Sequence, residues 1–481
     1  MSKIARNTTY LTAAYVFQKA TAFVYFALIA RHFGVDLLGK YTFSVFFVML
    51  LSILIDLGLN QVLTREIAKY PEKTNEYFDN IFSFKILLGI VVYGLAIFLV
   101  YVLGYPQITK NLVMITGVIM FFDGLTQTMH ATMRGHQNLK YESIGTVIYQ
   151  TVEIGIGACV LLFHWPIYGL AIAILGGSLG NFTYTISRIV NVFKVKIGIL
   201  FEKAVIKNLL RLAAPFFIAG VFIKVYSHID SVLLTKLAGD AAMGFYSVPY
   251  KLVFSLQVLP MAFGASVYPA FSHYWLKSRE LLKNTFEKSF FYLMVTVLPI
   301  TFGTIALADQ IIVKVYSNQY EPSILALKIL IISAFFSFLT FPIGALLNAC
   351  DRQKTNTRNI GIVMVINIVL NLILIPRLSF VGASIAALCS QVLLFTLGLA
   401  YVSGIIHYDK KYLGWSFIKI VLASAVMGGL AYLVKDQVHV VFNIAIAGLV
   451  YIGMIMVSAT VSKSDIKEML RLAKFKKMDK I

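Results

Sequence analysis

The segment that decides the fold runs from Thr8 to Tyr41 and reads TTYLTAAYVFQKATAFVYFALIARHFGVDLLGKY. It carries Lys19 near the middle of a long apolar run and ends in the pattern Gly34-x4-Gly39-x-Tyr41. The same arrangement returns 205 residues later, at Lys224, Gly239, Gly244 and Tyr246. Because a lysine in hydrocarbon is costly, two lysines at matching depth indicate a function that the two halves share.

The composition places the chain in a membrane. Of its 481 residues, 59% are hydrophobic and only 13% are charged, which is too few polar side chains to cover a surface in water. Apolar runs of about 20 residues recur between short polar breaks, and a run of that length crosses a bilayer as a helix. The first run follows Lys3 and Arg6 and is too long for the apolar region of a signal peptide. The sequence therefore predicts an all-α, polytopic membrane protein.

We expect about fourteen transmembrane spans. They cover residues 8–30, 41–64, 80–103, 111–133, 143–163, 167–187, 212–235, 243–270, 287–308, 323–349, 357–376, 380–406, 415–434 and 439–461. Lysine and arginine are about four times as frequent in the connections on the side of the N-terminus as on the other side, so both termini are expected in the cytoplasm, in the cell membrane. The net charge of +20 then belongs mainly to a basic face that meets anionic membrane lipids, and nucleic acid is not an expected partner.

The repeat extends along the chain and predicts its domain organisation. FFDGLT at 121–126 matches FFSFLT at 335–340, and spans 1–6 and 7–12 are expected to be two copies of a six-helix unit with a cleft between them. The predicted parts are an N-terminal lobe at 1–200, a C-terminal lobe at 201–408, two added helices at 409–462 and a cytoplasmic tail at 463–481. The tail has the pattern of an amphipathic helix on the inner leaflet, with a solvated tail as the alternative.

Seven cations fall inside the apolar spans, and four of them are close enough to a span end to reach water. These four are Arg188, Lys419, Lys85 and Lys328. Lys19, Lys224 and, less deeply, Lys251 lie too far from an end for this explanation. A lysine at the centre of a lone span costs about 2.5 to 3.5 kcal/mol on insertion scales, so these side chains should face protein or water.

Two interpretations of Lys19 and Lys224 stay open. In the structural one, each lysine neutralises a nearby acid, and the candidate acids are Asp56, Asp123, Glu153 and Asp230. In the functional one, which we favour, the two lysines line the cleft and bind an anionic substrate, because no acid repeats with them at the matching offset. Lys251 and Arg31 extend this basic path toward the outside. His228 lies one helical turn from Lys224 and is a further candidate, with a buried hydrogen-bonding role as its alternative.

The four acids are also candidates for carrying coupling protons or sodium ions, since burial favours the neutral form of a carboxyl group. No pattern typical of an enzyme or a metal site accompanies them. The sequence GVDLLGKY at 34–41 approaches a phosphate-binding loop, but Tyr41 stands where Ser or Thr would bind magnesium and no strand precedes it. Cys159, Cys350 and Cys389 have unrelated spacings. We therefore expect no enzymatic activity, no cofactor and no metal.

Taken together, these features resemble a known family. Two six-helix copies, two added spans, a cation in the opening span of each copy, the A-R-x-x-G-x4-G-x-Y turn at 30–41 and the basic loop RGHQNLK at 134–140 are similar to the polysaccharide biosynthesis or Wzx-type oligosaccharide flippases of the multidrug/oligosaccharidyl-lipid/polysaccharide (MOP) exporter superfamily. The resemblance implies a fourteen-helix, pseudo-twofold, V-shaped transporter. It would move polyprenyl-(pyro)phosphate-linked oligosaccharide from the cytoplasmic to the outer leaflet by alternating access.

The resemblance also implies that Lys19, Arg31, Lys224 and Lys251 attract the phosphate of a lipid-linked oligosaccharide. Polysaccharide assembly proteins are further candidate partners, and we expect the chain to work as a monomer. Two other functions stay open. A drug or cation antiporter of the same superfamily would have twelve spans and an acid-dominated cavity, and a membrane-embedded polysaccharide polymerase or ligase would need a long outside loop with catalytic groups.

Overall fold

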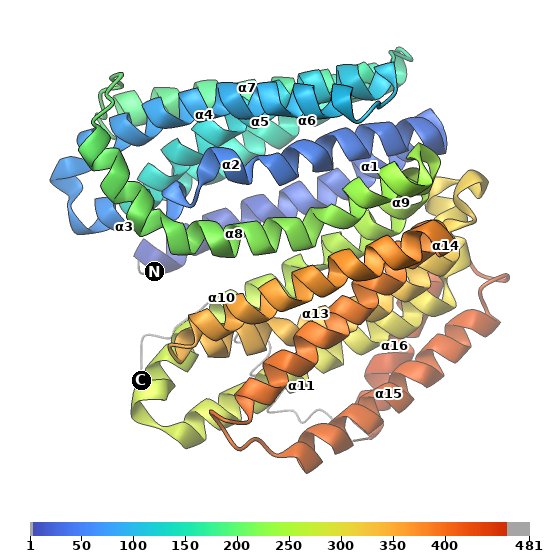
Figure 1. The fold of residues 1–481 in the computed structure, drawn as a ribbon. Helices are drawn as coiled ribbons and strands as arrows, with labels where there is room; N and C mark the ends of the chain where they lie inside the picture. Colours follow the sequence, from blue (N-terminus) through green and yellow to red (C-terminus); the bar gives the residue numbers. More distant parts are fainter. Residues whose placement is uncertain (1–2, 459–481) are drawn as a thin grey trace. The chain divides into compact units, whose positions relative to one another are not determined.

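The computed structural model describes residues 3–458, and every regular element within them is helical (Figure 1). The predicted tail helix at 463–481 lies outside the described residues. In chain order the elements are α1 Lys3–Leu51, α2 Ile53–Asp56, α3 Leu59–Lys69, η1 Pro71–Lys73, α4 Thr74–Val102, α5 Gln107–Gly135, α6 Lys140–Leu162, α7 Tyr168–Asn191, α8 Lys203–Ala238, α9 Asp240–Leu256, α10 Val258–Lys277, α11 Arg279–Ala306, α12 Ala308–Gln310, η2 Ile311–Tyr316, η3 Asn318–Tyr320, α13 Ser323–Ala349, α14 Gln353–Val402, α15 Lys410–Leu433 and α16 Val440–Val457.

Twelve segments of the described chain are long and apolar enough to cross a membrane. Two of these segments contain a non-helical residue, Gly34 (φ 75°, ψ 177°) in α1 and Ser379 (φ 51°, ψ −134°) in α14. Counted on each side of these two breaks, the segments correspond in order to the fourteen predicted spans. The chain is therefore a multi-pass, all-helical membrane protein, as the sequence predicts.

The chain forms two compact units, Met1–Ser247 and Val248–Ile481. The boundary falls inside α9, so the first unit holds α8 and the start of α9 in addition to the helices of the predicted N-terminal lobe. The six-helix lobes with a boundary at residue 200 stay a prediction.

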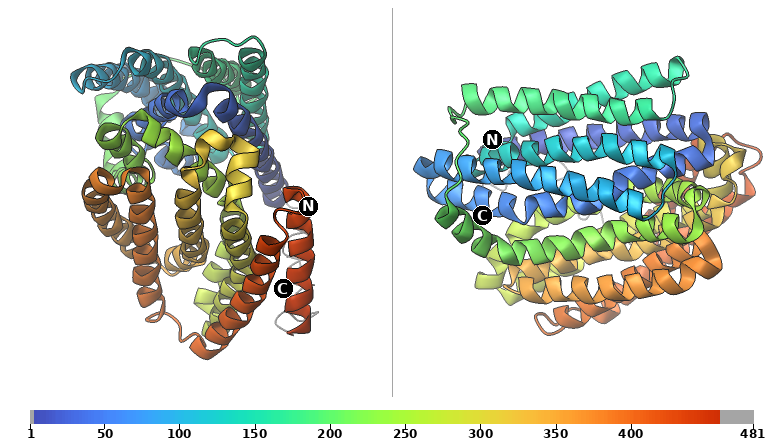
Figure 2. Two further views of the ribbon diagram at one scale, coloured as in Figure 1. Left: turned by 90° about the vertical axis from the view of Figure 1, so that its right-hand side faces the viewer. Right: turned by 45° about the horizontal axis from the view of Figure 1, so that its top comes forward.

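In the first unit, long helices run side by side, with α4 against α5, α5 against α7 and α6 against α7 (Figure 2). The short helix α3 is buried along one face. Its apolar residues Leu59, Val62, Leu63 and Ile67 recur every three or four positions and are almost fully inaccessible to solvent. They pack against Ile81 of α4, Ala131 of α5 and Leu209 of α8. This face fixes the position of α3 within the first unit.

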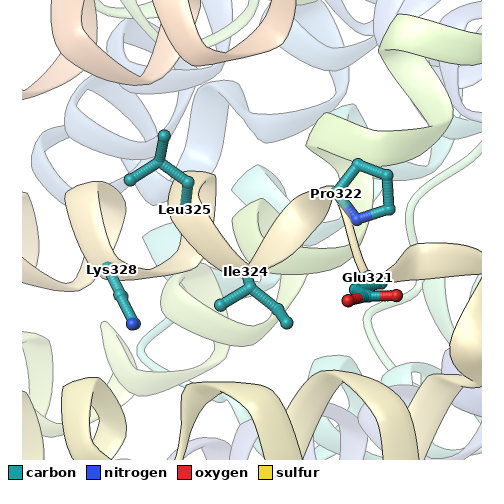
Figure 3. A pocket seen from close by; sticks show the side chains of 5 residues that line it. All are labelled: Glu321, Pro322, Ile324, Leu325 and Lys328. Atoms are coloured by element: carbon teal, nitrogen blue, oxygen red, sulfur yellow. The ribbon is translucent and has the colours of Figure 1, made fainter.

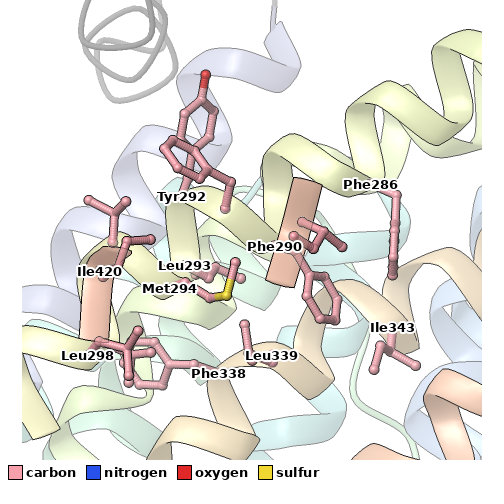
Figure 4. Close-up of a cluster of buried hydrophobic side chains, with 14 of the residues drawn as sticks. Phe286, Phe290, Tyr292, Leu293, Met294, Leu298, Phe338, Leu339, Ile343 and Ile420 are labelled. Atoms are coloured by element: carbon pink, nitrogen blue, oxygen red, sulfur yellow. The ribbon is translucent and has the colours of Figure 1, made fainter. Parts of the chain in front are cut away.

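In the second unit, α11 lies at the centre of the apolar core. Phe286, Phe290 and Leu298 of α11 are buried together with side chains of α13 and α15 (Figure 4). The two added helices attach here, because α15 packs on α11 and the hydroxyl of Tyr451 in α16 donates a hydrogen bond to the Val295 carbonyl of α11 at 2.8 Å. The two spans without a counterpart in the repeat are therefore anchored on α11.

The predicted turn repeat has the same backbone geometry in both copies. Gly34 has φ 75° and ψ 177°, and Gly239 has φ 89° and ψ 174°. This region of conformational space is strained for any residue with a Cβ atom, so both positions require glycine. The sequence similarity of the two turns therefore reflects a shared backbone conformation.

The two turns also contact each other, and the contact is reciprocal. A Cβ atom added to Gly39 would lie 1.8 Å from the carbonyl oxygen of Asp240, and one added to Gly244 would lie 2.0 Å from the carbonyl oxygen of Val35. Val35 and Asp240 are themselves 205 residues apart. Such an exchange of equivalent partners is what a local pseudo-twofold axis between the two turns produces.

Candidate functional site

A break interrupts the second span of the first unit. The helix α2 ends at Asp56, and Leu57 (φ 46°) and Gly58 (φ 76°, ψ 7°) separate it from α3. A Cβ atom on Gly58 would lie 2.7 Å from the backbone nitrogen of Phe217 and 2.8 Å from the carbonyl oxygen of Ala213, both in α8. Pro215 lies between these two residues and removes a backbone donor from α8. The broken segment and the backbone of α8 are therefore in direct contact.

One ammonium group bridges this break. Lys85 Nζ of α4 donates to Asp56 Oδ1 at 2.9 Å, before the break, and to Asn60 Oδ1 at 2.7 Å, after it. The Lys85 side chain is 0% exposed, whereas the Asp56 side chain is 21% exposed. The prediction that Lys85 reaches water at a span end is wrong, because a neighbouring carboxylate stabilises its charge inside the protein. Asp56 therefore neutralises Lys85, a lysine that is neither Lys19 nor Lys224, and the two interpretations of Lys19 and Lys224 stay open.

The α8 face near this break carries Lys224. A Cβ atom on Gly220 would lie 2.8 Å from Cδ1 of Ile53, and one turn later the half-buried Lys224 ammonium lies within electrostatic reach of Asp56. Within the described residues, Lys224 forms no ion pair, and the direct partner of Asp56 is Lys85. The carboxylate that acts on Lys224 is therefore already paired with Lys85, and the positive charge of Lys224 is only partly balanced.

The other predicted phosphate-binding cations lie on α1 and α9. Lys19 is half-buried and Arg31 is exposed on α1, and Lys251 is half-buried on α9. Within the first unit α1 packs against α8, and Phe46, which stacks on His228 of α8, lies after the break at Gly34, whereas Lys19 lies before it. Lys251 belongs to the second unit. The substrate-binding roles of these four cations stay predictions.

His228 and Asp230 have partners on neighbouring helices. The ring of His228 is buried and stacks on Phe46 of α1, with the ring centroids 5.3 Å apart. Asp230 is buried, and the Tyr246 hydroxyl of α9 donates to its Oδ2 at 3.0 Å. Tyr246 closes the second copy of the glycine turn, so the repeated motif supplies a hydrogen bond to a buried acid. The stacked ring favours the packing interpretation of His228.

Asp123 and Glu153 lie among α5, α6 and α7. The Ser178 hydroxyl of α7 donates to Asp123 Oδ1 at 2.5 Å, and Gln150 Nε2 donates to Glu153 Oε2 at 3.3 Å. Tyr149 lies within electrostatic reach of both carboxyl groups. The sequence gives no signal for Tyr149, because aromatic residues make up 14% of this chain. The structure therefore brings two of the four predicted acids near one tyrosine.

A pocket of about 460 Å³ opens at the N-terminal end of α13 in the second unit (Figure 3). It is lined by Glu321, Pro322, Ile324, Leu325 and Lys328, and none of the predicted site residues is among them. In the part of the chain that the structure describes, no three His, Cys, Asp or Glu side chains are grouped so that they could hold a metal ion. The candidate site is therefore the set of polar and charged groups within the helices.

A family model described as "Polysaccharide biosynthesis protein" matches residues 4–275, which is more than half of the chain. The chain belongs to the polysaccharide biosynthesis protein family. A second model, MatE, matches residues 215–373 of this family member.

Several similar proteins are named as flippases or transporters. The chain is 20% identical to the probable low-salt glycan biosynthesis flippase Agl15 of Haloferax volcanii, over 98% of this chain and 99% of the relative. Its fold is similar to that of the lipid II flippase MurJ in an inward closed conformation, with a TM-score of 0.75, 18% identity and coverage of 92% and 97% of the two chains. A multidrug resistance MATE family transporter of the MOP superfamily, in its inward-facing conformation, gives a TM-score of 0.62 at 13% identity and covers 81% and 95%. The family match confirms the expected polysaccharide biosynthesis family, and the two solved structures confirm the expected fold. These three relatives are flippases or transporters by name.

Proposed function

We propose that this protein is a flippase that moves polyprenyl-(pyro)phosphate-linked oligosaccharide from the cytoplasmic to the outer leaflet of the cell membrane, with both termini cytoplasmic. The observation that carries the proposal is the incomplete charge balance of Lys224. This half-buried lysine interacts electrostatically with Asp56, but the direct ion pair of Asp56 is with Lys85. A lysine with a partly balanced charge is suited to bind a phosphate group. The family membership and the glycan flippase relative support a lipid-linked glycan as the substrate.

The position of Lys224 beside a broken span supports the same role. Non-helical backbone at membrane depth is tolerated where protein buries it or where it lines a water-filled cavity, and discontinuous helices in transporters lie near substrate sites. In this proposal Lys224 and Lys19 bind the phosphate, while Arg31 and Lys251 extend the basic path. The lipid tail stays in the bilayer, and alternate opening of the two sides, by a single copy of the chain, relocates the headgroup.

Ion coupling is a further part of the proposal. Asp56 already neutralises Lys85, which leaves Asp123, Glu153 and Asp230 as the candidates to exchange a proton or a sodium ion. Transport into vesicles under an imposed proton gradient or sodium gradient distinguishes the two ions. A transport rate that responds to neither gradient would remove ion coupling from the account.

Substitution of the two repeated lysines tests the proposal in cells. Lys19→Ala and Lys224→Ala should each lower the export of lipid-linked glycan by roughly tenfold or more, the effect of losing one charge-assisted hydrogen bond, and Lys→Arg should retain part of it. Export is measured as surface glycan, and membrane insertion is measured as the amount of protein in the membrane fraction. Lys328→Ala is the matched control, because Lys328 is half-buried in a span and lies in the pocket of the second unit. Full export by the double alanine variant would overturn the proposal.

A further inference from the structure

Residues 195–202, which connect α7 to α8, form an extended strap along α4. Alternate backbone amides of the strap donate to side chains of α4. The four bonds join Lys196 to Asn75 Oδ1 at 3.1 Å, Gly198 to Asp79 Oδ1 at 3.0 Å, Leu200 to Ser83 Oγ at 3.1 Å and Glu202 to Asn80 Oδ1 at 2.7 Å. The connection between α7 and α8 is therefore held along its length by one helix.

The rise per residue of the helix α4 and of the extended strap explains why successive hydrogen bonds can form between them. Asn75, Asp79 and Ser83 are four residues apart on one face of α4, which corresponds to roughly 6 Å for each step. Every second residue of an extended chain advances by roughly 6.6 Å. The two steps are close enough for three successive hydrogen bonds to form. The polar side chains of α4 are thus spaced to hold an extended segment.

The strap exposes apolar side chains. Successive side chains of an extended segment point to opposite faces, so Ile197, Ile199 and Phe201 share one face. They are 38%, 92% and 56% exposed, respectively. The amides of the same three residues point away from α4, and no residue that the structure describes accepts a hydrogen bond from them. The outer side of the strap therefore combines apolar side chains with available backbone donors.

Cations surround this surface. The exposed cations from the end of α7 to the first turns of α8 are Lys194, Lys196, Lys203, Lys207 and Arg211, and Glu202 is the single acid between Lys194 and Arg211. Amide donors without acceptors are costly in hydrocarbon, while an exposed isoleucine and phenylalanine are costly in water. The headgroup layer of a membrane satisfies both, and the lysines favour headgroups with negative charge.

We propose that the strap is a docking surface for the anionic phospholipid headgroups of the cytoplasmic leaflet. Ile197, Ile199 and Phe201 enter the headgroup layer, and the outward amides and the flanking lysines bind the lipid phosphates. Because the strap joins α7 to α8, this contact ties the connection between the two repeated halves of the chain to the membrane surface. The proposal does not depend on the identity of the transported substrate.

Quenching of a tryptophan at position 199 by brominated lipids tests this proposal. The full chain with Ile199→Trp is reconstituted into phosphatidylcholine vesicles that contain the same fraction of either brominated phosphatidylglycerol or brominated phosphatidylcholine. The signal of the native tryptophans is subtracted with the parent chain in the same vesicles. The anionic lipid should quench Trp at this position at least twice as strongly as the zwitterionic lipid. Equal quenching by the two lipids, or no quenching by either, would overturn the proposal.

Two triple substitutions separate the local lysines from general surface charge. Lys194→Gln, Lys196→Gln and Lys203→Gln together should bring the ratio of the two quenching effects close to one. Lys354→Gln, Lys410→Gln and Lys411→Gln together remove the same charge from exposed positions of the second unit and should leave the ratio unchanged. The same ratio in both triple variants would show that the strap lysines do not select the lipid and would contradict the proposal.

Discussion

The two copies of the opening pair of spans break at matching residues but place different chemistry beside the breaks. The second span of each copy has a one-residue interruption between two helices, at Ser52 in the first copy and at Gln257 in the second, which are 205 residues apart and keep helical φ and ψ. In the first copy a second break follows at Leu57 and Gly58, next to the buried pair of Asp56 and Lys85. In the second copy α10 continues from Val258 to Lys277 without such a break. The backbone irregularities are partly shared, whereas the buried charged pair belongs to one copy.

The polar pairs near the glycine turns differ in the same way. Tyr25 and Tyr41 of the first copy occupy the positions of Asp230 and Tyr246 in the second. In the second copy the tyrosine donates a hydrogen bond to the acid at 3.0 Å, and in the first copy the two tyrosines lie within electrostatic reach of each other. The comparison teaches that the repeat preserves backbone geometry and one lysine in each copy, while acids are distributed unevenly. The charged groups beside the turns and breaks therefore differ between the two copies, although the backbone geometry of the turns is shared.

Among the substitutions that test the difference between the two copies, the largest loss of stability should come from Lys85→Met. Lys85→Met leaves Asp56 without its direct partner, and breaking a buried ion pair on one side costs about 3 to 5 kcal/mol of folding free energy. We expect a large fall in the temperature at which the purified protein loses its monodisperse state, measured by size-exclusion chromatography after heating. The double variant Asp56→Asn with Lys85→Met removes both charges and should recover much of the loss. Equal destabilisation in the single and double variants would show that the pair is not what stabilises the broken span.

A smaller effect should come from the reciprocal glycine contact. Gly39→Ala and Gly244→Ala each place a Cβ atom against a carbonyl oxygen, and forced overpacking costs about 1 to 3 kcal/mol. The two substitutions should lower the unfolding temperature by similar amounts. Gly39 contacts Asp240 and Gly244 contacts Val35, and these two contacts are equivalent in the repeat. Gly94→Ala is the matched control, since an added Cβ there meets no atom within 4 Å. If only one of the two substitutions lowered the unfolding temperature, the two contacts would not be equivalent, which would contradict this prediction.

The smallest loss of stability should come from the ion pair of Lys435 and Asp309, beside the added helices of the second unit. Lys435, in the connection from α15 to α16, forms an ion pair with Asp309 at 2.5 Å, and the Asp309 side chain is 42% exposed. Burial pushes the pKa of Asp309 up, but the hydrogen bond and charge of Lys435 outweigh it and lower the pKa, while the bond to Asp309 raises the pKa of Lys435. The stabilisation is therefore fully present between the ordinary values of about 3.9 and about 10.4 and is lost outside this window.

Asp309→Asn tests this pair. At neutral pH the substitution should lower the unfolding free energy by less than about 1 kcal/mol, because the pair is partly screened by solvent. The difference in unfolding temperature between parent and variant should shrink as the pH falls below about 3.9 or rises above about 10.4. A difference that is the same at acid and neutral pH would show that the charge of Asp309 does not hold this connection.

The sequence predicted much of the fold, and the reasons are physical. Apolar run length determines the spans, and the φ values that Gly34 and Gly239 adopt explain why the repeated turns kept their glycines. The partner of Lys85 lies 29 residues earlier in the chain, on another helix, and such a pairing depends on helix rotation that hydropathy does not specify. The strap along α4 was also not foreseen, because side chains such as Asn75 and Ser83 have many possible partners in a polar connection.

Flipping of a phosphate-containing lipid in vesicles tests the central claim most directly. The purified chain is reconstituted with a fluorescent short-chain polyprenyl pyrophosphate disaccharide, and flipping is measured as the fraction of label that an external reductant reaches with time. We predict rapid flipping by the parent chain, a rate roughly tenfold lower for Lys224→Ala and an intermediate rate for Lys224→Arg. A Lys224→Ala protein that flips this lipid at the parent rate would contradict the account.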